Sequence, residues 1–306
     1  MDPLSEVLSL LKMRSHISAG FDAGGDWSVH FALQSDVIKC YAIEEGSCWM
    51  VVDGIADPVR LEQGDCFVLP SGRSFRLTSD PDLRPVDSGH VFPAAHPDGV
   101  VRINDGGELL AVGSRFTVEG GHARTLLQMM PPIVRISREA DQSALRWAVE
   151  CVRAELREVR PGGALMADHL AHMMLLQALR LHLEEGSLGP GWFAALTDPR
   201  LGAAIQAMHA APAQKWTLQA LARIAGMSRS VFAERFRQTA GETPMDYLTR
   251  WRMMLACNAL EVNRDPVAVV ARTMGYDSES AFSTAFKRII GCTPSHYARG
   301  MATANG

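Results

Sequence analysis

The sequence lacks the long apolar run and the leader segment that would direct the chain into or across a membrane. No apolar stretch approaches the roughly 20 residues that a membrane-spanning helix needs. The first segment, MDPLSEVLSLLKMRSH, begins with acidic residues and has no small-residue cleavage site, so we expect no secretory signal. Its Leu4, Val7, Leu8 and Leu11 recur at helical spacing and predict a short amphipathic helix. We therefore expect a cytoplasmic protein without membrane contact.

Cysteine is scarce and scattered, with no Cys-x-x-Cys pair and no zinc-ligand spacing. The six cysteines are Cys40, Cys48, Cys66, Cys151, Cys257 and Cys292. In a reducing cytosol we expect free thiols, several of them buried as small apolar groups. A redox-sensing pair among Cys40, Cys48 and Cys66 stays open as an alternative, because spacing alone does not show whether two thiols meet.

Positive charge is concentrated near the C-terminus. The chain has a net charge of −4, yet residues 199–300 contain 13 Lys and Arg against 7 Asp and Glu. The remaining residues contain 17 against 27. An acidic body joined to a basic C-terminal region is typical of a protein that meets nucleic-acid phosphates at one end only. Chance clustering on a solvated surface is the alternative, and charge alone does not exclude it.

The pattern of apolar residues changes along the chain. Roughly the first 90 residues contain short β-rich runs separated by Gly, Asp and Pro turns, including VIKCYAIEE, SCWMVVDG, DPVRLE and DCFVLP, which predict a sandwich or barrel. From about Asp141, an N-cap candidate, the pattern becomes helical. A second helix, Ala164 to Glu185, is apolar around much of its circumference, so we expect it to pack between elements or against a second subunit.

An internal repeat is the most informative feature. Residues 232–247 read FAERFRQTAGETPMDY and residues 282–297 read FSTAFKRIIGCTPSHY, so both fit F-x-x-x-F-[RK]-x-x-x-G-x-T-P-x-x-Y. Each is preceded by an Ala, a Gly four residues later and a Ser suited to an N-cap. The residues are Ala222, Gly226 and Ser228 in the first copy, and Ala271, Gly275 and Ser278 in the second. This arrangement predicts two helix-turn-helix units joined by a helix over about residues 245–261.

The repeat resembles the DNA-binding domain of AraC-family transcription regulators over about residues 198–300. The segments that carry the resemblance are WTLQALARIAGMSRSVFAERFR and MGYDSESAFSTAFKRIIGCTPSHY. The resemblance implies two recognition helices that enter successive segments of the major groove of double-stranded DNA, within units at about 217–237 and 267–288. It also implies RNA polymerase as a partner and favours activation over repression.

The resemblance also implies which side chains face the DNA. The candidates for base contacts are Ser230, Ala233 and Glu234 in the first unit, and Glu279, Ser280, Ser283 and Thr284 in the second. The candidates for phosphate contacts are Arg229, Arg237, Lys287 and Arg288. Ala233 has no hydrogen-bonding group, so the first helix is expected to discriminate weakly between bases. Simple solvation is the alternative interpretation for each polar residue.

The N-terminal region resembles the cupin-type sensory domain of some AraC-like regulators. Gly64, Pro70 and Gly72 match the family pattern, but Phe75 stands where the pattern has a metal-binding His. Cys40 and Tyr41 stand where a metal-binding cupin has paired histidines. His30, His90 and His96 are substitutes in principle, yet isolated histidines are more often structural. We therefore expect no metal and no cofactor.

A small barrel of this kind can enclose a ligand. Candidate lining residues are Trp27, Tyr41, Trp49, Phe67 and Phe75, with Arg73 or Arg76 as an anion partner, although the same aromatic residues could simply fill the core. The expected fold is thus α+β: a cupin-like sensory barrel (1–135), a helical connector that forms a homodimer (136–192) and an all-α DNA-binding domain (198–300). We predict a regulator, not an enzyme, that responds to a small-molecule effector or a redox signal. A cupin enzyme, metal-free or metal-dependent, fused to a DNA-binding domain is the alternative.

Overall fold

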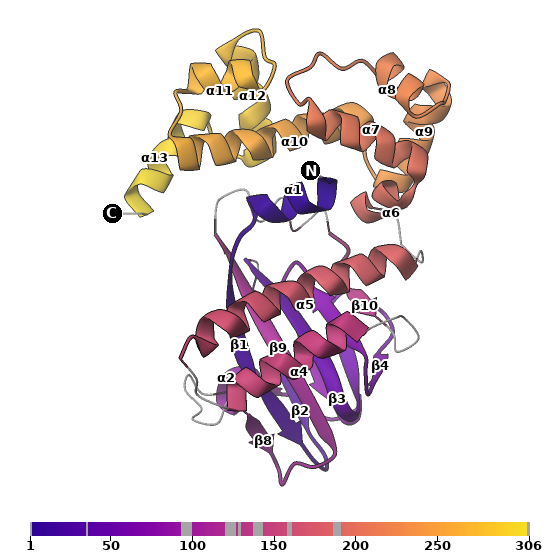
Figure 1. Cartoon of the computed structure of the whole chain (residues 1–306), viewed down its shortest axis with the longest axis vertical. Helices are drawn as coiled ribbons and strands as arrows, with labels where there is room; N and C mark the ends of the chain where they lie inside the picture. Colours follow the sequence, from indigo (N-terminus) through magenta and orange to yellow (C-terminus); the bar gives the residue numbers. More distant parts are fainter. Residues whose placement is uncertain are drawn as a thin grey trace. The chain divides into compact units, whose positions relative to one another are not determined.

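The computed structural model describes residues 2–34, 36–92, 100–119, 127, 130–136, 143–157, 161–185 and 191–304 (Figure 1). The chain divides into two compact units, which we treat separately. The sensory unit comprises Met13–Val118 and Pro131–Glu185. The DNA-binding unit comprises Met1–Lys12, Glu119–Met130 and Gly186–Gly306. The N-terminal segment therefore groups with the C-terminal helices.

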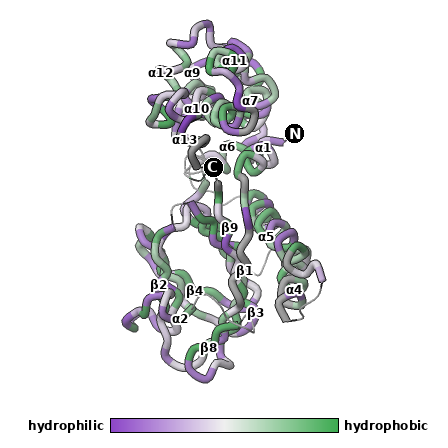
Figure 2. Tube along the Cα trace, turned by 90° about the vertical axis from the view of Figure 1, so that its left-hand side faces the viewer, coloured by the Kyte–Doolittle hydropathy of each residue, from purple (hydrophilic) through white to green (hydrophobic). Residues whose placement is uncertain are grey.

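The described part of the sensory unit is built on one ten-stranded sheet that bends into a barrel (Figure 2). Its strands are β1 (Lys12–Ala23), β2 (Ser28–Phe31), β3 (Val37–Val52), β4 (Val59–Glu62), β5 (Cys66–Leu69), β6 (Phe75–Thr78), β7 (Val86–Asp87), β8 (Val101–Ile103), β9 (Leu109–Glu119) and β10 (Val134–Ile136). The main path runs β7-β2-β6-β3-β9-β1-β8, and β4, β5 and β10 pair beside it. A short helix, α2 (Ser88–Val91), follows β7.

Strand β3 carries the bend of the sheet. Its first half pairs with β9 and β5, and its second half pairs with β4 and β6. The register with β9 shifts between Ile43 and Glu45, which is the mark of a bulge that increases local bending. The sequence predicted two separate strands here, divided at Gly46. The structure has one continuous strand because the bulge absorbs the irregularity without ending the hydrogen-bonded ladder.

Aromatic side chains fill the barrel interior. Phe75 stacks on Phe31 with ring centroids 4.5 Å apart, and Tyr41 stacks on Phe67 at 5.2 Å. All four rings are buried in one apolar cluster. Beside them, Lys39 is only 4% exposed; its Nζ donates to the Ala32 carbonyl and lies 5.1 Å from the centre of the Phe75 ring. Burial lowers the pKa of Lys39 to about 8.

Two helices cover one outer face of the barrel (Figures 1 and 2). Helix α4 (Ser143–Arg157) packs on α5 (Gly163–Glu185), and α5 packs on β10 and β5. The buried side of α5 follows helical spacing, with Ala167, Leu170, Ala171, Met174, Leu175, Ala178 and Leu179. Asp141, the predicted N-cap, lies outside the described residues. The two helices belong to the same compact unit as the barrel.

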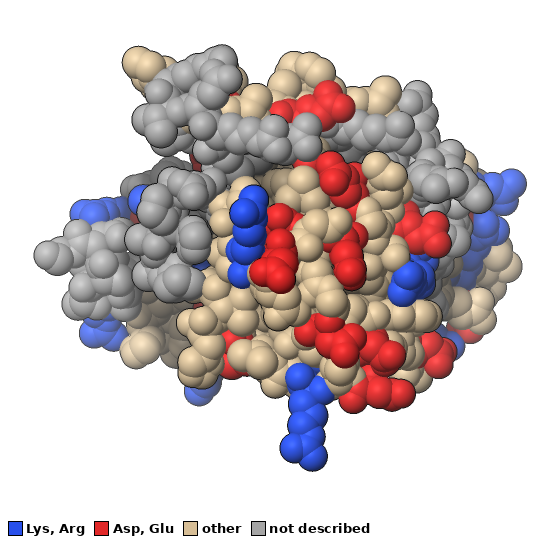
Figure 3. All heavy atoms as spheres, turned by 90° about the horizontal axis from the view of Figure 1, so that it is seen from below, with Lys and Arg blue, Asp and Glu red and all other residues tan. Residues whose placement is uncertain are grey.

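The sensory unit has a face rich in acidic side chains. Asp and Glu side chains gather on the face drawn in Figure 3, with few Lys or Arg among them. Such a surface repels polyanions. Within the described part of the chain, no helix is both long and apolar enough to span a bilayer.

The described part of the DNA-binding unit is all helical. Its elements are α1 (Pro3–Leu10), α6 (Trp192–Thr197), α7 (Pro199–Ala210), α8 (Leu218–Ile224), α9 (Arg229–Ala240), α10 (Pro244–Asn258), the π-helical turn η1 (Ala259–Asn263), α11 (Val267–Thr273), α12 (Glu279–Ile290) and α13 (Pro294–Ala304). The two predicted helix-turn-helix motifs are α8–α9 and α11–α12. Helix α10 connects them, as the apolar spacing of residues 245–261 predicted.

A buried polar chain joins the N-terminal helix to the core of the DNA-binding unit. His209 lies with Nδ1 2.8 Å from a carboxylate oxygen of Glu6 and Nε2 2.7 Å from the hydroxyl of Tyr247. Trp192 donates to the same hydroxyl at 2.9 Å. The imidazole also stacks on Trp251, with ring centroids 3.8 Å apart. A neutral imidazole satisfies all of these groups by donating to Glu6 and accepting from Tyr247.

We expect this histidine to make the DNA-binding unit sensitive to acid. Burial lowers the pKa of His209 from its ordinary value of 6.5 to about 3, so between these values the unfolded chain binds more protons than the folded one. Stability should therefore fall as pH drops below 6.5, by up to about 1.4 kcal/mol per pH unit. Native-state hydrogen exchange in α7 and α10 at pH 7 and pH 5 measures this.

The control for the acid prediction is His209→Gln, which cannot be protonated. It should show lower stability at pH 7 but a weaker dependence on pH. Stability that instead rises as pH falls would contradict the prediction. It would mean that the nearby Glu6 carboxylate, and not burial, controls the protonation of His209.

Candidate DNA-binding surface

The turns of both helix-turn-helix units have the conformations that the repeat predicted. Gly226 has φ +63° and Gly275 has φ +79°, values that a β-carbon disfavours. The hydroxyl of Ser228 accepts from the amide of Val231, and that of Ser278 accepts from the amide of Ala281, which caps each recognition helix. Ala222 and Ala271 are buried where the two helices of each unit meet. These three local predictions are confirmed in both copies of the repeat.

Paired phenylalanines hold each recognition helix to its core. Phe232 and Phe236 are fully buried with ring centroids 5.7 Å apart, and Phe282 and Phe286 are fully buried at 5.6 Å. Phe286 also packs edge-on against Tyr297, 5.6 Å away. With the phenylalanines turned inward, the opposite faces of α9 and α12 are directed to solvent.

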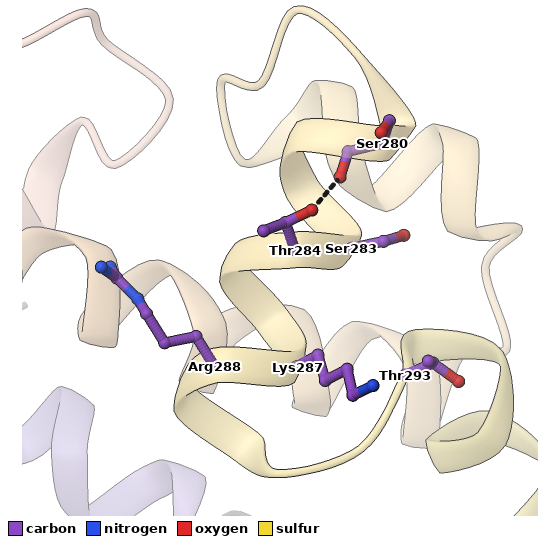
Figure 4. A pocket seen from close by; sticks show the side chains of 6 residues that line it. All are labelled: Ser280, Ser283, Thr284, Lys287, Arg288 and Thr293. Carbon is purple, nitrogen blue, oxygen red and sulfur yellow. Dashed lines mark hydrogen bonds between the residues drawn. The ribbon is translucent and has the colours of Figure 1, made fainter.

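The outer face of α12 forms an open groove (Figure 4). The groove is lined by Ser280, Ser283, Thr284, Lys287, Arg288 and Thr293. Five of the six sequence candidates on α12 are thus brought together, all except Glu279. Lys287 extends toward Thr293, whereas Arg288 extends the other way (Figure 4). The groove therefore presents hydroxyl groups beside two cations.

Two details of this groove differ from what the sequence predicted. Glu279 is exposed at the first turn of α12 but does not line the groove. Thr293, which sequence analysis did not select, does line it. Thr293 caps α13 by accepting from the amide of His296 at 3.3 Å. The T-P step of the repeat was the signal that marked this position, because Thr followed by Pro is typical of a helix start.

Some side chains on the outer face of α9 bond to one another. Glu234 accepts from Arg237 at 3.0 Å and from Gln238 at 2.6 Å. Both partners of the Glu234–Arg237 pair are more than half exposed, so this pair contributes only about 0–1 kcal/mol and can open at little cost. Arg229 and Ser230 are exposed at the start of the helix, and Ala233 is half-buried. In the free protein, one outward cation of α9, Arg237, is therefore already paired with Glu234.

The residues predicted to line a ligand pocket occupy two different environments. Trp27, Tyr41, Phe67 and Phe75 belong to one buried core cluster. Trp49, in contrast, is half-buried under the guanidinium of Arg60, 5.2 Å from its ring. Arg73 donates to the carbonyl of Asp53.

The structure gives no support for a metal site in the part of the chain that it describes. There, no three His, Cys, Asp or Glu side chains come together to hold an ion. Phe75 points into the aromatic core, and His30 bonds to the hydroxyl of Ser74 at 2.8 Å. His90 is exposed, and His96 lies outside the described residues.

Comparison with known proteins identifies both regions. A cupin family model matches residues 2–184, and a helix-turn-helix domain model matches residues 221–300. The chain is 42% identical over 299 residues to a putative AraC-like transcription regulator of Streptomyces lividans, covering 97% of this chain and 98% of that protein. The chain belongs to the AraC-like transcription regulators. It is a DNA-binding transcription regulator with an N-terminal ligand-sensing domain of the cupin type.

The chain is also similar to other named regulators and to a solved DNA-binding domain. The chain is 30% identical over 298 residues to the RCS-specific HTH-type transcriptional activator RclR of Escherichia coli, with 97% of each chain covered. Among solved structures, the DNA-binding domain of AdpA in complex with a target DNA is 30% identical and matches with a TM-score of 0.33, covering 35% of this chain and 96% of that one. The curated relatives confirm the predicted family. The two family models, with the barrel and the helices of the structure, confirm the predicted fold class.

Proposed function

We propose that this AraC-like regulator reads its DNA site with two recognition helices, α9 and α12, and activates transcription through RNA polymerase. The groove on α12 carries the proposal, because hydroxyl groups suit base edges and the adjoining Lys287 and Arg288 suit phosphates. In α9 the equivalent positions are Ser230, Ala233, Glu234, Arg237 and Gln238. Ala233 has no hydrogen-bonding group, and Glu234 already accepts from Arg237 and Gln238, so α9 supplies fewer groups for reading bases. The second helix is thus the principal reader.

The binding mode predicts a steep dependence on salt. We expect the full chain to bind a duplex selected from a random DNA pool, with log K falling linearly with log salt at a slope of roughly −0.9 per phosphate contact. Arg229→Ala should make the slope less steep, since it removes one such contact. Arg60→Ala, at an exposed cation of the barrel, is the matched control and should leave the slope unchanged. A folded protein that binds no duplex at low salt would contradict the proposal.

We infer that the barrel receives a small-molecule effector. A redox signal is the second candidate, and the approach of Cys40 and Cys66, with sulfurs 3.9 Å apart, supports it. Both thiols are fully buried, however, and the hydrogen bond with Cys66, together with burial, raises the pKa of Cys40 well above its ordinary value. A protonated thiol reacts slowly with oxidants, so a small-molecule effector is favoured over a redox signal. Mass spectrometry of the protein as isolated from cells tests for a bound effector, and a Cys40–Cys66 disulfide after mild oxidation would reverse this preference.

We also infer that the sensory domain performs no catalysis and holds no metal, and that the protein works in the cytoplasm. The departure of Phe75 from the metal-binding pattern supports this inference. Elemental analysis that finds about one iron, zinc or manganese per chain would contradict it and would revive the enzyme alternative.

The connector helices are proposed to form a homodimer. Trp147 on α4 and Leu165 and Met166 on α5 expose 55%, 63% and 52% of their surface, which is costly for side chains of this size. At micromolar concentration we expect sedimentation of a dimer, and Leu165→Asp should shift it toward monomer. The matched control is Leu33→Asp, since Leu33 is 64% exposed on a barrel loop. A clean monomer for the unmodified protein would contradict the proposal.

A further inference from the structure

The two helix-turn-helix units touch through more than their connecting helix. The loop at residues 211–216, just before α8, lies against the turn at residues 275–277 between α11 and α12. A β-carbon at Gly275 would come within 2.2 Å of the carbonyl oxygen of Ala213, so the two backbones are in direct contact. The equivalent Gly226 in the first unit has no atom within 4 Å of such a β-carbon. The contact is therefore specific to the second turn and is not a general demand of the motif.

Side chains reinforce this contact from both sides. Arg252, on α10, donates to the carbonyls of Pro212 and Gln214 at 2.6 and 2.8 Å, which fixes the loop to the connecting helix. Its guanidinium also lies 5.8 Å from the ring of Tyr276 in the second turn. Burial lowers the pKa of Arg252 from its usual value. An arginine guanidinium stays charged at neutral pH. One side chain thus holds the loop, the connecting helix and the second turn together.

An exposed ion pair also links loop 211–216 to turn 275–277. The Lys215 ammonium lies 2.7 and 3.0 Å from the two carboxylate oxygens of Asp277. Both side chains are about three-quarters exposed, so the pair adds little stability, but it joins the residue before Trp216 to the residue before the N-cap of α12. Loop 211–216 and turn 275–277 immediately precede α8 and α12, respectively. Whatever holds them together holds the two helix-turn-helix units at one separation and one angle.

We propose that this contact, which we call the inter-turn clamp (residues 211–216 and 275–277 with Arg252), determines the spacing between the two DNA segments that the protein accepts. The proposal rests on the proposed function, in which both α9 and α12 enter the major groove. One added base pair moves the second segment by about 3.4 Å along the duplex and about 35° around it. A rigid pair of helices cannot follow both changes, whereas a pair joined only through α10 and η1 can bend. Arg252, Lys215, Asp277 and Gly275 are therefore positioning residues for operator spacing.

The experiment measures binding of the full chain to duplexes in which the selected site is lengthened or shortened by one or two base pairs between its two segments. For the unmodified protein, a change of one base pair should weaken binding by about tenfold or more. In Gly275→Ala and Arg252→Met the same change should weaken binding by less than about threefold. Lys215→Ala, at an exposed residue that is safe for folding, should show a smaller loss of discrimination in the same direction.

Matched controls separate the clamp from general damage. Gly226→Ala carries the same cost of a positive φ but lacks the contact with another loop. Arg250→Met, on the same helix as Arg252, removes the pair with Glu242. Both should keep the full preference for one spacing. The proposal is overturned if the folded clamp variants keep that preference, or if the unmodified protein binds all spacings alike. If the proposed function itself were wrong, substitutions in α9 would leave binding to the selected site unchanged, which the clamp variants alone would not reveal.

Discussion

Replacing Phe286 with Ala should lower the free energy of unfolding of the DNA-binding unit by about 3–5 kcal/mol. Phe286 is fully buried and packs on Phe282 and Tyr297 within one apolar cluster that also contains the end of α10. Removing its ring leaves a cavity that rigid neighbouring helices cannot close. The loss is a large part of the stability of a small helical unit, so specific DNA binding should disappear with it.

The measurement is chemical unfolding followed together with binding to the selected duplex. Val231→Ala is the control, because Val231 is 55% exposed on α9 and its truncation leaves no cavity. That variant should change stability by less than about 0.5 kcal/mol. If Phe286→Ala unfolded at the same denaturant concentration as the unmodified protein, the assignment of this face of α12 to the core would be wrong.

Base-reading and phosphate-binding residues of α12 should give separable defects. Thr284 donates its hydroxyl to the carbonyl of Ser280, 3.0 Å away, which leaves its methyl group and the two acceptor lone pairs of its oxygen for the groove. Thr284→Ala should therefore change the preferred base pair at one position of the site, costing about 1–3 kcal/mol there. Glu279→Ala should have a smaller effect, since Glu279 does not line the groove.

Lys287→Ala, in contrast, should weaken binding to all sequences alike and reduce the salt slope by roughly one. Lys287 is exposed at the groove edge and extends toward Thr293, as a phosphate-binding cation would (Figure 4). The assay titrates each variant against single-base variants of the selected site at two salt concentrations. A change in base preference for Lys287→Ala, with none for Thr284→Ala, would show that α12 lies in the groove in another orientation.

A local pattern predicted the capping role of Thr293 but not its position in the groove. The Thr-Pro step predicted a helix start, and α13 does begin there, because a capping hydroxyl and a fixed proline φ act within a single turn. That the same residue completes a groove beside Lys287 depends on how α13 folds back onto α12. No spacing in the sequence encodes that return.

In the sensory domain, too, local patterns predicted elements and residue types but not how they are arranged, as strand β3 and the aromatic core show. Alternating apolar residues predicted strands on both sides of Gly46, but only the pairing with β9 decided that they form one bent strand. The sequence selected Trp27, Tyr41, Trp49, Phe67 and Phe75 as a single group. The fold separated Trp49 from the others, because Trp49 lies beside Arg60 while the remaining four lie in the core cluster.

The sequence by itself determined the family, the two helix-turn-helix units, their glycine turns, their serine caps and the inward phenylalanines. All of these depend on residues within a few turns of one another, where periodicity, capping and backbone freedom are decisive. Only the tertiary structure decided which distant residues meet. The pairing of Glu6 with His209, of Lys215 with Asp277, and of Gly275 with Ala213 joins residues far apart in the chain. Such contacts arise from the packing of whole helices, which no local pattern specifies.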